Sequence, residues 1–319
     1  MRSGHASRTA EHNALFRALE SSLPKNRRLF QDPLARAFLT WPLTVVGRIA
    51  PVPGLRDLVR GFIDHRWPGV RSSVVARTKL IDDAISASMD QGMAQLVILG
   101  AGYDARAHRL PGLLPMPVFE VDHPDTQRAK QRALRDAHPA VSMNVRYIAS
   151  DFNRGELESA MAATGYRETV PTVFLWEGVT NYLTEAAVDA TLRWCARAAS
   201  GSLLIFTYVH QDVLTHPHRF VGTDKLFASL AKAGEKLTFG LDPAELAAYL
   251  ADRGLSLERD IGAAEYRALY FGDEARKMRG HEFYRVAFVR TGGACARPPG
   301  STPAERRGCT PHWERNMKQ

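Results

Sequence analysis

Short, mostly apolar runs recur along the middle of the chain, and more polar segments with helical periodicity separate them. A continuous apolar run of five or six residues is typical of a strand that is buried on both faces, as in a parallel sheet. The pattern predicts strands at 95–100, 117–122, 145–149, 172–176 and 202–207.

Helical periodicity fills the intervals between these runs. From Val74 to Met89 apolar residues recur at the spacing of an amphipathic helix, and Gly92 follows as a stop signal. Further helices are expected from Pro124 to before Pro139, near 156–163, and after the N-cap residue Thr184. Strands that alternate with helices in this way predict an α/β fold with a Rossmann-like, doubly wound sheet.

The alternation breaks near the end of the sheet region. Segments 255–260 and 283–290 both have the composition of strands, with no complete crossover helix obvious between them. This break suggests a terminal antiparallel strand inserted in the otherwise parallel sheet.

Three regions follow from the pattern. Residues 1–73 are helical and then apolar over 38–55, where Arg48 and three prolines exclude a membrane span and favour a packed helical cap or lid. Residues 74–290 carry the predicted sheet. Residues 291–319 are rich in Gly, Pro, Arg, Ser and Thr, which predicts a disordered basic tail.

Charge and cysteine content narrow the function. The net charge is +8, of which residues 1–30 contribute +4 and 291–319 contribute +3, so 31–290 hold only +1. A nucleic-acid enzyme needs a basic stripe on its folded face, so this distribution argues against a nucleic-acid substrate. The three cysteines show neither metal-ligand nor disulfide spacing, and no signal peptide is recognisable. We therefore expect a cytoplasmic protein without a metal site.

A glycine loop directly follows the first predicted strand. The segment Leu99-Gly-Ala-Gly-Tyr-Asp-Ala105 matches G-x-G-x-x-A, whose glycines let the backbone turn tightly and approach a ligand. Asp122 lies 20 residues after Gly102, where a carboxylate can accept hydrogen bonds from ribose hydroxyls. Gly100, Gly102 and Asp122 predict a nucleoside cofactor, either NAD or S-adenosylmethionine.

Polar residues further along the chain bear on the choice between NAD and S-adenosylmethionine. Asp151 and Phe152 follow the third strand, where the side chain and the next backbone N–H can bind adenine; a helix N-cap is the alternative role of Asp151. Glu177 follows the fourth strand and needs a partner there, such as the amino group of a methionine moiety. Arg77 can pair with the methionine carboxylate. A structural salt bridge is the alternative for both residues.

Five segments in this order resemble the leucine carboxyl methyltransferase family, which includes protein phosphatase methyltransferases and a bacterial branch thought to methylate small molecules. They are Ala76-Arg-Thr78, Leu99-Gly-Ala-Gly-Tyr-Asp-Ala-Arg106, Phe119-Glu-Val-Asp-His-Pro124, Ser150-Asp-Phe152 and Glu177-Gly-Val-Thr-Asn-Tyr-Leu183. The resemblance covers about residues 74–210 and implies a class I methyltransferase fold with a helical cap.

The resemblance also implies a contact for each part of S-adenosylmethionine. The implied contacts are Arg77 for the methionine carboxylate, Glu177 on the amino-group side, Gly100 in the cofactor loop, Asp122 for ribose, and Asp151 and Phe152 for adenine. Ala105 stands where relatives often have a threonine, a mild departure.

The implied reaction is methylation of an oxygen, with a carboxylate favoured as acceptor. A carboxylate is ionised at neutral pH and needs no general base, whereas a hydroxyl needs one. Tyr182, Tyr208 and His210 follow strands and are candidates for a catalytic role beside the acceptor. The apolar cap over 38–63 suggests a small or amphipathic acceptor, and 210–236 is a second candidate lid segment.

Two other functions remain open at this point. An NAD-dependent oxidoreductase would use a related sheet, although the chain has no convincing Tyr-x-x-x-Lys pair. A non-catalytic protein that binds the cofactor or a partner is the second alternative.

Overall fold

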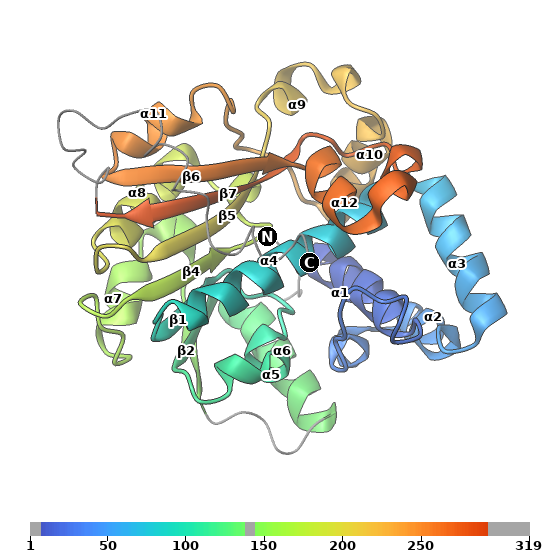
Figure 1. Ribbon diagram of the computed structural model, residues 1–319, viewed down its shortest axis with the longest axis horizontal. Helices are drawn as coiled ribbons and strands as arrows, with labels where there is room; N and C mark the ends of the chain where they lie inside the picture. Colours follow the sequence, from blue (N-terminus) through green and yellow to red (C-terminus); the bar gives the residue numbers. More distant parts are fainter. Residues whose placement is uncertain (1–7, 138–143, 293–319) are drawn as a thin grey trace, which may run out of the picture.

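A seven-stranded sheet crosses the molecule in the order β3-β2-β1-β4-β5-β7-β6 (Figure 1). The computed structural model describes residues 8–137 and 144–292. Its strands are β1 (Gln95–Leu99), β2 (Val118–Asp122), β3 (Val145–Ala149), β4 (Thr172–Trp176), β5 (Leu203–Val209), β6 (Leu255–Gly262) and β7 (Tyr284–Thr291). Neighbouring strands pair in parallel, except that β7 runs antiparallel to both β5 and β6. The predicted α/β, Rossmann-like, doubly wound sheet with a terminal antiparallel strand is confirmed.

Helices cover both faces of this sheet. The α-helices are α1 (Arg8–Ser21), α2 (Leu43–Ile49), α3 (Pro53–Arg66), α4 (Val70–Asp90), α5 (Arg106–Arg109), α6 (Pro124–Ala137), α7 (Leu157–Ala162), α8 (Glu185–Ala196), α9 (Asp212–Thr215), α10 (Thr223–Ala233), α11 (Leu246–Ala251) and α12 (Ala263–Phe271). Short 3-10 helices are η1 (Ala35–Phe38), η2 (Pro111–Leu113), η3 (Phe152–Arg154), η4 (Thr180–Tyr182), η5 (Pro217–Arg219) and η6 (Gly272–Lys277).

The side chains of β1 show how the two layers form. Leu96 and Ile98 pack in one apolar cluster with α4, α5 and α12, whereas Val97 and Leu99 pack in another with α7, α8 and α11. Side chains of a strand alternate between the faces of a sheet, so a strand covered on both sides must be apolar at every position. This requirement explains the continuous apolar runs of the sequence.

The predicted helices are confirmed with shifted ends. The helix expected from Val74 begins at Val70, and Thr184 caps α8 by accepting a hydrogen bond from the backbone N–H of Ala187 at 3.2 Å. No helix was predicted at α5, α9, α10, α11 or α12. Helix α12 lies between β6 and β7, where no complete crossover helix was recognised. It spans only nine residues and buries Arg267 beside Ala263 and Tyr266, so its apolar periodicity is weak.

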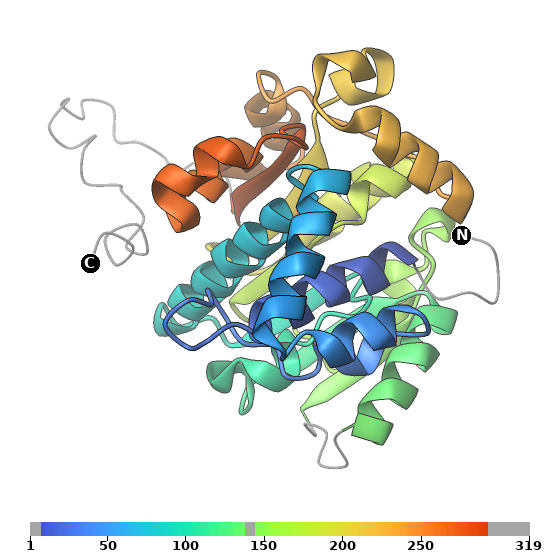
Figure 2. The ribbon, with the colours of Figure 1, turned by 90° about the vertical axis from the view of Figure 1, so that its right-hand side faces the viewer.

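Helices α1 to α3 form the N-terminal cap, which crosses in front of the other elements in Figure 2. Its apolar core joins α1 and η1 to α6, with Leu19, Phe38 and Leu134 in one cluster. The boundary expected between residues 73 and 74 falls inside α4. The tail expected over 291–319 lies outside the described residues from position 293 onward.

Candidate functional site

A cavity of about 480 Å³ opens at the carboxyl ends of β1 to β4. Its wall is formed by the loops after these strands, by α1 and by the segment after α10. Ligands of open α/β sheets bind at this edge, and this volume is in the range of small-molecule sites. Of the predicted cofactor residues, the wall contains Gly100, Gly102, Asp122, Asp151, Phe152 and Glu177.

The glycine loop is folded tightly against the sheet. Gly100 and Ala101 both donate backbone hydrogen bonds to the carbonyl of Val121, at 2.7 and 3.1 Å. The φ angle of Gly100 is +69°, and a Cβ at this position would lie 2.3 Å from a methyl carbon of Val179. Only glycine therefore fits this position, and it keeps the backbone at the cavity wall.

Asp122 ends β2 and faces the loop. Its carboxylate accepts hydrogen bonds from the backbone N–H groups of Gly102 and His123. Burial raises the pKa of this carboxyl, and the two N–H donors oppose the rise. Each oxygen accepts one of these two bonds and keeps a lone pair for a further donor.

Two hydroxyls in the wall are buried without a hydrogen-bond partner among the described residues, Thr126 Oγ1 and Ser150 Oγ. Asp151 N-caps η3 by accepting from the backbone N–H of Asn153 at 3.0 Å, so the alternative role foreseen for it is present. Phe152 packs on Trp176 with ring centroids 6.3 Å apart. Polar groups and an aromatic ring thus lie together at the adenine end implied by the sequence.

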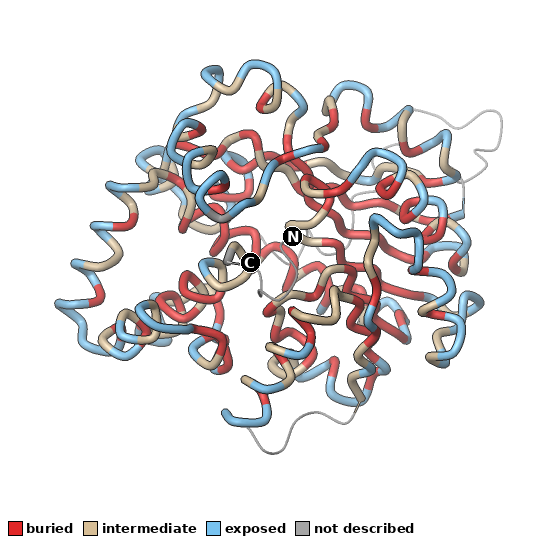
Figure 3. Tube along the Cα trace, turned by 180° about the vertical axis from the view of Figure 1, so that it is seen from behind, coloured by how far each residue is buried: buried red, intermediate tan, exposed pale blue. Residues whose placement is uncertain are grey.

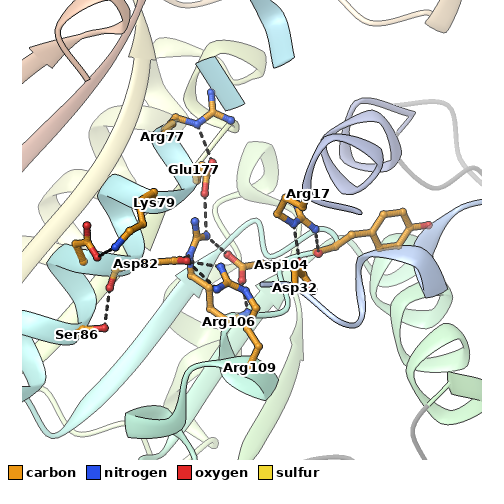
Figure 4. Close-up of polar contacts among 12 residues, drawn as sticks. Arg17, Asp32, Arg77, Lys79, Asp82, Ser86, Asp104, Arg106, Arg109 and Glu177 are labelled. Carbon is orange, nitrogen blue, oxygen red and sulfur yellow. Dashed lines mark hydrogen bonds and ion pairs between the residues drawn. The ribbon is translucent and has the colours of Figure 1, made fainter. Parts of the chain in front are cut away.

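Glu177 lies between two arginines (Figure 4). Arg77 Nε donates to one carboxylate oxygen at 2.7 Å and Arg106 Nη1 to the other at 2.9 Å. Burial alone would raise the pKa of Glu177, but Arg106 and Arg77 reverse the effect and hold it below its ordinary value. Arg77 itself does not line the cavity, since its guanidinium is buried against Glu177 and over the ring of Tyr284.

Arg106 is the centre of a buried ionic cluster. No role had been predicted for Arg106 from the sequence. Besides Glu177, it contacts Asp104 and donates from Nε to Asp82 at 2.7 Å. Arg109 pairs bidentately with the same Asp82, at 2.7 and 2.8 Å. Together with Arg77, the cluster contains three arginines and three carboxylates, so its formal charges balance. The motif Asp104-Ala-Arg106 was visible in the sequence, but the contacts join segments that are far apart along the chain.

The three candidates for an acceptor-side role separate in the structure. Tyr182 lines the cavity, but Tyr208 and His210 do not. The Tyr208 hydroxyl donates to Asp260 at 2.9 Å, and the His210 ring packs on Phe220. Alternate residues of a strand face opposite layers of the sheet, and Tyr208 packs in the apolar cluster of one face rather than at the cavity.

The cap contributes to the wall in a way that local patterns did not reveal. Thr9, Asn13 and Arg17 of α1 line the cavity, and Thr9 Oγ1 donates to Glu235 at 2.6 Å across its rim. Arg17 donates to the Tyr103 carbonyl at 2.6 Å and to Asp32 at 2.8 Å. The leucines of this helix predicted that it packs, but not against which element.

These groups fit S-adenosylmethionine on structural grounds. A nucleoside needs acceptors for its ribose hydroxyls, donors and acceptors for its base and a close backbone approach, and Asp122, Ser150 and Gly100 provide them. Within the described ranges, no group of three or more His, Cys, Asp or Glu side chains is placed to hold a metal ion. No helix of those ranges is both long and apolar enough to cross a membrane.

Comparisons with known proteins identify the family of the chain. The family model of leucine carboxyl methyltransferase matches residues 10–196. A candidate S-adenosyl-L-methionine-dependent methyltransferase of Streptomyces coelicolor is 35% identical over 211 residues, which cover 65% of this chain and 70% of the relative. Another from Frankia alni is 36% identical over 200 residues, 62% of this chain and 67% of the relative.

A solved structure supports the fold independently. A candidate methyltransferase from Thermobifida fusca superposes with a TM-score of 0.52 at 17% identity, covering 88% of this chain and 94% of that one. Neither the oxidoreductase nor the non-catalytic alternative is favoured by these matches. The chain belongs to the leucine carboxyl methyltransferase family of S-adenosylmethionine-dependent methyltransferases.

Proposed function

We propose that this methyltransferase esterifies a carboxylate of a small or amphipathic acceptor in the cavity below the cap. The observation that carries the proposal is the state of Tyr182, the acceptor-side candidate that lines the cavity. Burial raises its pKa far above the ordinary value, so the phenol stays protonated and can donate a hydrogen bond but cannot serve as a base. His210, the other base considered, lies outside the cavity wall. A carboxylate acceptor needs neither, because it is already ionised.

We assign the cofactor contacts by the chemistry of each group. Asp122 accepts the ribose hydroxyls, Asp151 and Phe152 border the adenine, and Gly100 and Gly102 allow the backbone to approach the cofactor. Glu177 faces the amino group of the methionine moiety, while Arg77 and Arg106 fix the orientation of Glu177 from behind. This assignment makes Arg77 a positioning residue rather than a direct ligand of the cofactor carboxylate.

Bound S-adenosylmethionine supplies an electrophilic methyl group, so the chain has mainly to align the acceptor oxygen with it. Tyr182 and the α1 residues Thr9 and Asn13 line the cavity, and we assign them to the side where the acceptor binds. The hydrogen bond between Thr9 of α1 and Glu235, which follows α10, joins these two segments beside the acceptor side of the cavity. We propose that the two segments form the lid, which excludes water from the acceptor.

The test uses methyl-labelled S-adenosylmethionine and paired acceptors, each carboxylic acid beside the alcohol of the same carbon skeleton. Mild alkali hydrolyses a methyl ester and releases labelled methanol, but leaves a methyl ether intact. We expect label that alkali releases, formed from the acids. Label that resists alkali, formed from the alcohols, would contradict the carboxylate proposal.

The variant Tyr182→Phe tests whether the Tyr182 hydroxyl acts as a hydrogen-bond donor or as a base. Loss of one donor should reduce kcat/KM by about tenfold, with a pH profile that stays flat near neutrality. A loss of several orders of magnitude together with a changed pH profile would indicate a base and contradict the proposal.

A further inference from the structure

A cluster of exposed apolar side chains lies on the cap. Among the described residues, nine large apolar side chains are exposed, and six of them lie between positions 41 and 62. Trp41, Leu58 and Phe62 are 82%, 71% and 65% exposed. We call these six residues, Trp41, Val45, Val52, Leu55, Leu58 and Phe62, the cap patch. Exposed apolar residues that cluster in this way mark an interaction surface, whereas single ones need no explanation.

Helix α3 differs from an ordinary surface helix because apolar side chains lie on its exposed side as well as on its buried side. Leu55, Leu58 and Phe62 follow one another at helical spacings of three and four on its exposed side. On its inner side Arg56 is buried and donates to the Ser22 carbonyl at 3.1 Å. Arg60 is half-buried within the electrostatic reach of Glu20. The helix thus buries Arg56 beside Ile63 and leaves an apolar stripe exposed.

The helix is also the outermost element of the cap. It lies at the right-hand edge in Figure 1, away from the sheet. Figure 3 views the molecule from behind, where the same edge is on the left and most of its backbone is coloured as exposed. A protruding helix of this kind is suited to a broad, flat surface rather than to a groove.

Cations surround the apolar stripe. Arg48 follows Val45 by one helical turn on α2, and Arg66 follows Phe62 by one turn on α3; both are exposed. Arg27, also exposed, acts electrostatically on Asp57 of α3. Over residues 24–67 one acidic side chain, Asp57, is exposed, against five exposed basic ones: Lys25, Arg27, Arg36, Arg48 and Arg66. The partner must therefore combine an apolar interior with negative charge at its surface.

These charges distinguish between possible occupants. A symmetric contact between two copies would place one basic patch against the other, which is electrostatically unfavourable. An anionic bilayer instead offers acyl chains to Leu58 and Phe62, headgroup charges to the arginines, and an interface at which tryptophan is enriched. We propose that the cap patch binds the protein peripherally to an anionic lipid surface, with α3 lying in the interface. This contact is independent of which acceptor is methylated.

The test is co-sedimentation of the full chain with vesicles of phosphatidylcholine alone or mixed with phosphatidylglycerol. The wild type should partition to the mixed vesicles, and added salt should weaken its binding. Leu58→Ser/Phe62→Ser and Arg48→Gln/Arg66→Gln should each lower the partition coefficient by at least about tenfold. The matched control is Leu114→Ser/Leu269→Ser, which alters exposed apolar residues outside the patch and should bind like the wild type.

Three outcomes would overturn the proposal. The first is wild-type protein that stays in the supernatant with both kinds of vesicle. The second is equal loss of binding in the patch and control variants. The third is a wild-type dimer, seen by light scattering, that Leu58→Ser/Phe62→Ser converts to a monomer, because the patch would then be a contact between copies of this chain.

Discussion

The cavity edge of the sheet buries charged side chains in ion pairs, whereas the outer cap exposes apolar side chains to solvent. At the edge, Arg106 is buried and pairs with three carboxylates, of which Asp82 and Glu177 also pair with Arg109 and Arg77. On the cap, α3 exposes Leu58 and Phe62, while Arg56 is buried on its inner side. Burial of charge is costly unless it is paired, so the edge gains fixed geometry from its ion pairs. The cap instead leaves apolar area in water, where it is available to a partner.

The largest effect on stability is predicted for a substitution of Arg106. Arg106→Met should lower the free energy of unfolding by about 3–5 kcal/mol, because it removes the ion-pair partner of Asp104 and leaves three buried carboxylates with only Arg77 and Arg109. Chemical denaturation at neutral pH measures the loss. Arg48→Gln, on the exposed cap, is the control and should change stability by less than about 0.5 kcal/mol. Similar small losses in both variants would remove the contrast between the two regions.

A second prediction concerns how the free energy of unfolding changes at low pH. Burial alone would raise the pKa of Asp104, but Arg106 and Lys130 lower it from 3.8 to about 2. A carboxyl whose pKa is lowered by folding stabilises the folded state above its unfolded pKa and loses this contribution as the pH falls. Asp104→Asn should therefore cost about 2 kcal/mol at neutral pH, and the difference from wild type should shrink as the pH falls from 4 towards 2.

Unfolding curves measured across that pH range test this sign. Asp136→Asn, at an exposed position of α6, serves as the control and should follow the wild type throughout. A cost for Asp104→Asn that stays constant with pH would mean that packing, rather than charge, explains it.

A third prediction concerns Asp122, the cavity carboxylate that retains lone pairs for a ligand. Asp122→Asn turns one acceptor oxygen into a donor, so affinity for S-adenosylhomocysteine should fall by about tenfold. Titration calorimetry measures the affinity, with NAD as the comparison ligand. Unchanged affinity in the variant, or tighter binding of NAD than of S-adenosylhomocysteine, would refute the assignment of this carboxylate.

The smallest effect is expected on the cap. Leu58→Ser/Phe62→Ser should change the free energy of unfolding by no more than about 0.5 kcal/mol, because both side chains are already largely in water. Its methyl transfer to a water-soluble acceptor should equal that of the wild type. A loss of several kcal/mol would show that the patch is part of the core.

The sequence predicted those features that local rules determine. Buried strands such as Leu96–Leu99 and the Thr184 cap depend on nearby residues, so periodicity and capping rules located them. The glycine loop and Asp122 were found because their spacing is set by one strand–loop–strand unit.

Other features depend on contacts between distant segments. Arg106 meets Asp82 and Glu177 only after folding, so its central position had no sequence signal. The same holds for Thr9 and Glu235, which are 226 positions apart. Tyr208 lies outside the cavity wall, which the sequence did not show because the end of a strand does not say which face each side chain takes. Helix α12 escaped notice because a buried arginine interrupts its short apolar pattern.

Helix α4 has a consequence for how this family can diversify. It contacts α1 and α3 of the cap and also α12 above the sheet, and it runs unbroken from Val70 to Asp90. A recombination event that exchanged the cap as a module would have to join two halves of one continuous helix. We expect new substrate preferences to arise instead by single substitutions on the inner face of α1. Shuffled chimaeras with a junction at residue 73 should yield far fewer folded proteins than libraries randomised at Thr9 and Asn13.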